Sequence, residues 1–179
     1  MKNDFVMPVV VLVLICVVIS GALAATNSVT GPVIVKGATE RAEAARIEIL
    51  PEADGFERIS PQREICGVTE CYRATNGAGF VISVSGDGYG GNGSLSLMVA
   101  VSPEGAIIAT KTLANSDTKG IGSKVSEPLY ESQFAGMDSS LGGYIAITGA
   151  TVSSNAYRSA VENALAAYAA IAGQEGENE

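Results

Sequence analysis

The residues with the clearest capacity to bind a ligand lie in the stretch Thr148-Gly149-Ala150-Thr151-Val152-Ser153-Ser154. Apolar Tyr144–Ile147 precedes this stretch and an amphipathic pattern follows it, which predicts a short strand, a glycine turn rich in hydroxyl groups and a helix. The N–H groups and positive dipole end at the start of a helix favour an anion, and phosphate is the natural guest. Ordinary N-capping by Ser153 or Ser154 is the alternative, and the spacing leaves both open.

Two glycine-rich stretches could approach the same ligand. The first, Gly86–Gly93, contains Gly88-Tyr89-Gly90, in which glycine permits close backbone approach and Tyr89 could lie against a planar ring. A flexible hairpin loop is the alternative for this stretch. The second, Ser116–Lys124, combines glycines, hydroxyl groups and two lysines and could bind an anion, although GxG outside a strand–helix context does not establish a nucleotide site.

Composition excludes several kinds of site chemistry. The 179 residues include no His and only three Cys, which removes Ser–His and Cys–His nucleophile pairs and every histidine metal site. We therefore expect no catalytic side chain and no metal. The formal net charge of −8 argues against a nucleic-acid partner, which needs a basic surface. Hydrophobic residues make up 47% of the chain, which excludes an intrinsically disordered protein.

Cys66 and Cys71 have four residues between them and lie outside the most apolar segment. They could form a local disulfide in an oxidising compartment or remain free thiols, and the sequence leaves these alternatives open.

The segment Phe5–Ala25 is almost wholly apolar, and no charged residue occurs from there to Lys36. About 20 such residues suffice to cross a bilayer. We predict a retained single-span anchor with its N-terminus in the cytoplasm, since Lys2 and the terminal amine precede the span. A signal peptide cleaved after Ala22-Leu23-Ala24, which would release a secreted binding domain, is the alternative.

The rest of the chain predicts strands and helices. A helix capped by Thr39 and stopped by Pro51 comes first. Two hairpins follow, and the final amphipathic helix is expected to end at Gly173. The expected strand pairs are 70–74 with 80–85, around Asn76–Gly79, and 95–101 with 106–111, around Ser102–Gly105.

These elements predict an α+β protein in which a small domain, with an antiparallel sheet and packed helices, follows a single transmembrane helix. We expect a transmembrane anchor over residues 1–26 and a membrane-proximal helical connector over 27–55. The ligand-binding domain would span 56–173, and an acidic tail 174–179.

Taken together, these stretches resemble the G-subunit family of Rnf electron-transport complexes. That family belongs to the FMN-binding domain family, which also includes the C-subunit family of the sodium-translocating NADH:quinone reductases. The resemblance covers nearly the whole chain. It rests on the order of the anchor and several motifs: TNSVT at 26–30, GYGG at 88–91, DTKGIGSKV at 117–125 with Glu127-Pro128 and Gln133-Phe134 downstream, and TGATVSS at 148–154.

The resemblance implies that a flavin transferase attaches FMN through a phosphoester bond to the last threonine of the S/T-G-A-T motif, here Thr151. The other residues implied in cofactor binding come from all three stretches: Thr148, Gly149, Ala150, Ser153, Ser154, Gly88, Tyr89, Gly90, Gly120, Gly122 and Lys124. One position departs from the family motif, because Ile145 stands where the family usually has an aspartate six residues before the flavinylated threonine.

The implied function is an electron carrier within an ion-translocating ferredoxin:NAD⁺ oxidoreductase, with its FMN domain on the outer face of the cell membrane. Its partners would be the other membrane and redox subunits of the complex. The flavin would perform the redox chemistry, which suits a chain without histidine. Ile145 motivates an alternative, a structural subunit of the same kind of complex that carries no flavin.

Overall fold

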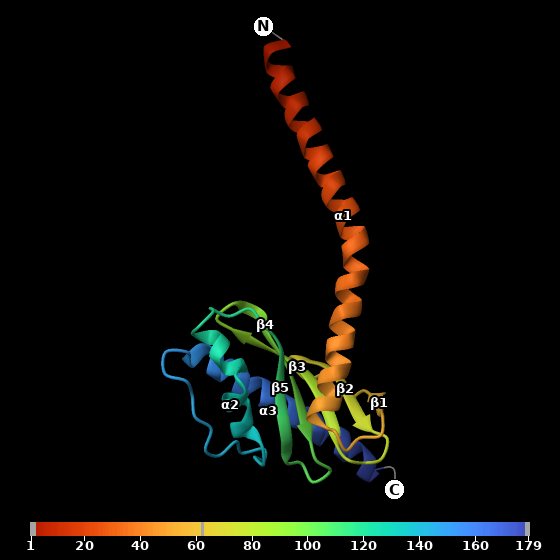
Figure 1. Ribbon diagram of the computed structural model, residues 1–179, viewed down its shortest axis with the longest axis vertical. Helices are drawn as coiled ribbons and strands as arrows, with labels where there is room; N and C mark the ends of the chain where they lie inside the picture. Colours follow the sequence, from red (N-terminus) through yellow and green to blue (C-terminus); the bar gives the residue numbers. More distant parts are fainter. Residues whose placement is uncertain (1–2, 62, 178–179) are drawn as a thin grey trace. The chain divides into compact units, whose positions relative to one another are not determined.

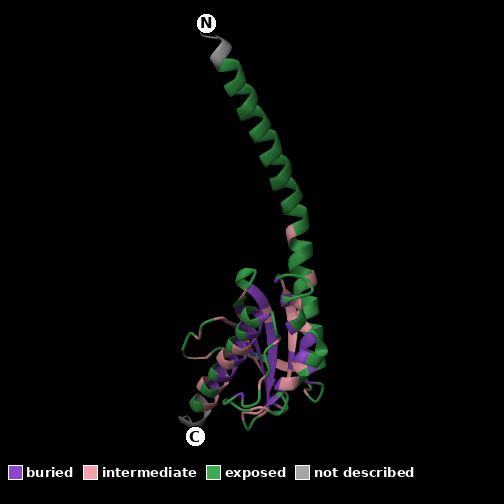
Figure 2. Cartoon of the chain, turned by 90° about the vertical axis from the view of Figure 1, so that its left-hand side faces the viewer, coloured by how far each residue is buried: buried purple, intermediate pink, exposed green. Residues whose placement is uncertain are grey.

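The computed structural model describes residues 3–61 and 63–177. It divides the chain into two compact units, Met1–Arg41 and Ala42–Glu179. The first unit is formed by α1, which runs from Asn3 to Ile49 and so continues into the second unit. Among the described residues, α1 is the one helix long and apolar enough to cross a membrane, with a window of mean hydropathy 3.0. Figure 2 shows that α1 is exposed from Val6 to Thr30.

The prediction that Thr39 caps a new helix is wrong, because Thr39 lies inside α1. Its hydroxyl donates to the carbonyl oxygen of Val35 at 3.1 Å, and the Thr26 and Thr30 hydroxyls bond back four residues in the same way. A threonine hydroxyl can serve either as a cap or as a donor to the preceding turn, so residue type alone did not locate the helix start. The end of α1 at Ile49, just before Pro51, agrees with the prediction.

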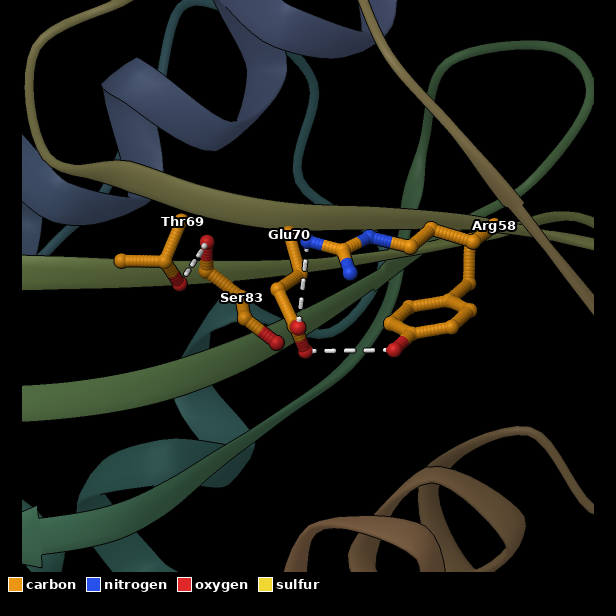
Figure 3. Close-up of polar contacts among 5 residues, drawn as sticks. Arg58, Thr69, Glu70 and Ser83 are labelled. Carbon is orange, nitrogen blue, oxygen red and sulfur yellow. Dashed lines mark hydrogen bonds and ion pairs between the residues drawn. The ribbon is translucent and has the colours of Figure 1, made fainter. Parts of the chain in front are cut away.

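The second unit contains one antiparallel sheet in which sequential strands are neighbours (Figure 1). The two predicted hairpins are confirmed, but the first strand was not predicted. The sheet order is β1 (Phe56–Ile59), β2 (Val68–Ala74), β3 (Phe80–Gly88), β4 (Gly91–Val101) and β5 (Ile107–Asn115). Figure 3 shows polar contacts at the β1 side of the sheet. There, Glu70 pairs with Arg58 at 3.4 Å and accepts a hydrogen bond from Tyr72 at 3.2 Å.

Both faces of the sheet are buried. On one face, α3 (Thr151–Glu177) packs Tyr157, Val161 and Leu165 against alternate residues of β3 and β4. On the other face, Ala45, Ile49 and Leu50 cover residues that include Val81 and Met98. This two-sided packing explains why β4 is apolar at successive positions rather than at every second one. The predicted α+β architecture is confirmed.

Arg46 lies within the second apolar cluster, where only 8% of its surface is exposed. Its guanidinium group stacks 3.5 Å from the centre of the Tyr72 ring and 5.5 Å from that of Phe56. The planar cation therefore spreads over aromatic faces instead of reaching water.

Between β5 and α3 the chain forms two 3₁₀ helices, η1 (Gly122–Ser126) and η2 (Ser132–Phe134), and the short helix α2 (Pro128–Glu131). The predicted strand over Tyr144–Ile147 is wrong, since this segment is irregular. Side chains satisfy its backbone: the Ile145 N–H donates to Gln133 Oε1 at 2.9 Å and the Ile147 N–H to Ser154 Oγ at 3.0 Å.

The final helix is longer than predicted, because α3 continues through Gly173 to Glu177. A glycine inside a helix costs about 1 kcal/mol relative to alanine and so weakens a helix without having to end it. Residues 174–177 of the predicted acidic tail are therefore helical, and residues 178 and 179 lie outside the described residues.

Candidate functional site

The three stretches singled out in the sequence meet at one cavity of about 400 Å³ in the second unit. One wall comes from the turn between β3 and β4, a second from the loop after β5, and a third from the start of α3. The lining residues are Tyr89, Thr118, Ile121, Gly122, Gly149, Ala150, Thr151, Val152 and Ser153. Segments about 30 residues apart along the chain thus form a single pocket.

The structure separates the predicted site residues into two groups. Those that line the pocket are Tyr89, Gly122, Gly149, Ala150, Thr151 and Ser153. Those outside its lining are Thr148, Ser154, Gly88, Gly90, Gly120 and Lys124. Sequence reasoning did not select Thr118, Ile121 or Val152. All three belong to quoted motifs, Thr118 and Ile121 to DTKGIGSKV and Val152 to TGATVSS, so motif membership is the signal that could have selected them.

The start of α3 forms one side of the pocket. Gly149 turns the chain with a φ of +83°, a value that glycine adopts readily. The first intrahelical bond runs from the Ser154 N–H to the Ala150 carbonyl at 2.9 Å. The N–H groups of Thr151, Val152 and Ser153 precede that bond, so they are available to an anion at this end of the helix.

The alternative interpretation, in which Ser153 or Ser154 caps α3, is therefore wrong, because the helix begins before both residues. The buried Ser154 hydroxyl instead accepts the Ile147 N–H of the preceding loop. Ser153 is also buried and contributes to the pocket lining.

Asp117 joins two walls of the pocket from behind. Its Oδ1 accepts hydrogen bonds from the Gly90 N–H and the Ser94 hydroxyl, both at 2.8 Å, and only 6% of the residue is exposed. Burial opposes the charged form, but the nearby Ser153 hydroxyl and the donors at Gly90 and Ser94 outweigh it. The pKa of Asp117 consequently lies below its ordinary value of 3.8.

The glycines at 88, 90 and 122 make room for this carboxylate. A Cβ at Gly88 would collide with the Asp117 carboxylate, and a Cβ at Gly90 would stand 2.9 Å from the Ser116 carbonyl oxygen. At Gly122 a Cβ would lie 2.6 Å from Ser153 Oγ and 2.7 Å from Asp117 Cβ. The close approach expected of these glycines is therefore to Asp117 and its surroundings.

The remaining predicted residues lie elsewhere. Lys124 is exposed and outside the pocket lining. Cys66 and Cys71 are free thiols in the described part of the chain, Cys66 exposed and Cys71 buried. Burial raises the pKa of Cys71 to about 11. Ile145 is 74% exposed.

Residues 88–166 match the family described as the FMN-binding domain. The matched residues include every residue that lines the pocket. This agreement between a family match and a cavity marks the pocket at the start of α3 as the candidate cofactor site.

Over most of its length the chain is also similar to three curated proteins. It is 25% identical to the G subunit of the proton-translocating ferredoxin:NAD(+) oxidoreductase complex of Clostridium ljungdahlii, over 86% of each chain. It is 27% identical to the G subunit of the ion-translocating oxidoreductase complex of Shewanella baltica, over 92% of this chain and 90% of that one. The corresponding G subunit of Methanosarcina acetivorans is 29% identical, over 88% and 90%. The resemblance to the G-subunit family is confirmed.

The pocket suits FMN chemically. Its volume lies in the range of small-molecule sites, and the start of α3 offers N–H groups to a phosphate. Tyr89, Ile121 and Val152 are 72%, 51% and 53% exposed, so they present apolar surface to a planar ring. Thr151 is exposed and lines the same pocket, with its hydroxyl on the first residue of the helix.

Proposed function

We propose that this chain is a membrane-anchored electron-transfer subunit of an ion-translocating oxidoreductase complex of the Rnf type, with FMN held in the pocket at the start of α3. The observation that carries the proposal is the coincidence of this pocket with the FMN-binding family match. Similarity to G subunits over most of the chain, together with the apolar helix α1, supports its place in a membrane complex.

The proposed attachment is a phosphoester between the Thr151 hydroxyl oxygen and the FMN phosphate, formed by a flavin transferase. Thr151 is exposed, which suits modification by another enzyme, and it begins the helix whose free N–H groups favour a phosphate. A linkage there would leave the flavin beside the exposed faces of Tyr89 and Ile121, the latter in the neighbouring loop.

When bound, FMN supplies reversible electron transfer, and the residues of the chain position it. The first turn of α3 orients the phosphate, while the Tyr89 ring and the Val152 side chain shield part of the pocket from water. We also propose that the N-terminus is cytoplasmic and the FMN domain lies on the outer face, on the basis of Lys2 and the terminal amine before the span. The other membrane and redox subunits of the complex would exchange electrons with it there.

The attachment can be tested by producing the full chain with and without a flavin transferase and measuring the intact mass of membrane-extracted protein. We expect one FMN adduct only when the transferase is present, and none in Thr151→Ala. Thr118→Ala is the matched control because Thr118 is the other threonine that lines the pocket, and it should keep the adduct. An adduct that persists in Thr151→Ala would disprove attachment at this residue. The same mass shows whether the anchor is retained.

Ile145 favours a second candidate function, a structural subunit without flavin. It stands at the position of the motif aspartate and is 74% exposed, so a flavin transferase could contact it. Ile145→Asp restores the carboxylate of the family motif. If the native chain stays colourless with an active transferase while Ile145→Asp acquires the adduct, the structural role is the correct one. Equal loading of both chains would support the electron carrier.

A further inference from the structure

The buried carboxylate of Asp117 has an unused acceptor. Its Oδ1 is engaged by the Gly90 N–H and the Ser94 hydroxyl, whereas Oδ2 is buried and makes no hydrogen bond among the described residues, although the Ser153 hydroxyl lies near the carboxylate. An ionised carboxylate can accept several hydrogen bonds, and a buried oxygen without one is unusual in a folded protein. A group of this kind requires an explanation beyond packing.

The carboxylate lies directly behind the pocket wall. Gly122 lines the pocket, and a Cβ built there would stand 3.2 Å from Asp117 Oδ2. The next residue in the chain, Thr118, also lines the pocket, and Tyr89 lies between two glycines packed against Asp117. The backbone of Gly122, which carries no side chain, therefore separates the Asp117 carboxylate from a ligand bound in the pocket.

The donors that hold the charge are neutral. The Gly90 N–H and the Ser94 hydroxyl, together with the nearby Ser153 hydroxyl, favour the ionised form of the carboxylate without cancelling its net charge. Two lysines follow in the same loop, Lys119 and Lys124, but both are exposed and screened by water. In a poorly hydrated interior the field of the carboxylate extends into the pocket more strongly than it would through water.

We propose that Asp117 is a positioning residue that lowers the reduction potential of FMN bound in this pocket. Reduction adds negative charge to the flavin, and a fixed negative charge behind the wall makes that addition less favourable. The same carboxylate holds the β3–β4 turn, which carries Tyr89, in place through Gly90. This inference rests on the proposed function, because it requires FMN in the pocket.

The experiment is a spectroelectrochemical titration of the FMN-loaded full chain and its variants at one neutral pH. Asp117→Asn keeps an oxygen for the Gly90 N–H and the Ser94 hydroxyl but removes the charge, so the potential should shift to a more positive value. Asp87→Asn is the matched control, because Asp87 is an exposed carboxylate near the end of β3, beside the same turn, and accepts the Gly93 N–H at 2.8 Å. Its potential should equal that of the native chain. An unchanged potential in Asp117→Asn, or equal shifts in both variants, overturns the inference.

Ser94→Ala keeps the proposal testable where Asp117→Asn does not fold. That variant retains the carboxylate and removes one of its donors, so the charge is less compensated and the potential should become more negative. A constant or more positive potential overturns the inference. Flavin content, read from absorbance before each titration, separates the two proposals. A native chain that takes up no FMN refutes the proposed function. If the chains bind FMN but neither substitution changes the potential, only the role of Asp117 is refuted.

Discussion

Replacement of Gly122 by alanine tests whether the pocket wall is shaped by its contact with Asp117. Gly122 does not adopt a positive φ, so alanine suits its backbone and only the added methyl group matters. That methyl would stand 2.6 Å from Ser153 Oγ and 2.7 Å from Asp117 Cβ. The Ser153 hydroxyl can rotate away, but Asp117 Cβ moves only with its loop. Overpacking of this kind costs about 1–3 kcal/mol.

For a folded unit of this size we expect the melting temperature of Gly122→Ala to fall by about 3–10 °C. Because Ser153 and Gly122 both line the pocket, the affinity of the unmodified chain for FMN should also fall by about tenfold, or ~1.4 kcal/mol. Thermal unfolding and fluorescence titration with FMN measure the two effects. Gly142→Ala is the matched control, since its nearest contact is Ser140 Oγ at 3.4 Å and its φ is not positive. If Gly122→Ala has the same melting temperature and the same affinity for FMN as Gly142→Ala, the reasoning is refuted.

Three further predictions concern single residues. Asp117→Asn should lower the free energy of unfolding by about 1–3 kcal/mol at pH 7. Since the pKa of folded Asp117 lies below 3.8, this difference should persist above that pH and fade as the pH falls through the folded value, in denaturation at stepped pH. Arg46→Ala should cost about 1–3 kcal/mol through lost packing on Tyr72, whereas Arg46→Met should cost less, and equal costs in chemical denaturation would contradict this. Cys66 should react with a maleimide in the native chain and Cys71 only after unfolding, as mass spectrometry of the labelled peptides will show.

The local features of the fold could be predicted from sequence because short-range physics decides them. The turn at Asn76–Gly79 carries its own signal, and Asn76 Oδ1 does accept the Ala78 N–H at 3.2 Å. The apolar spacing of Tyr157 and Val161 predicted the buried face of α3. Hydroxyl residues were harder to place, because Thr39 and Ser154 can satisfy either a helix end or a neighbouring backbone group with the same chemistry.

The site was harder to predict than the strands because its organising residue acts at a distance. The motif residues gathered at one pocket as expected, but the glycines at 88 and 90 depend on Asp117, which follows almost thirty residues later. No local pattern links a glycine to a carboxylate that will pack against it in the folded chain. The predicted strand over Tyr144–Ile147 failed for a related reason, since side chains of Gln133 and Ser154 replaced the strand partner.

The positions of Asp117 and Thr151 together give a physical reason for a covalent cofactor. The free N–H groups at the start of α3 attract a phosphate, but the buried carboxylate beside Ser153 carries charge of the same sign as that phosphate. Repulsion between these like charges weakens reversible binding of FMN. The same repulsion disfavours the additional negative charge that FMN carries when it is reduced. A phosphoester to Thr151 would hold FMN regardless of that repulsion, so a chain of this design could keep a low potential without losing its flavin.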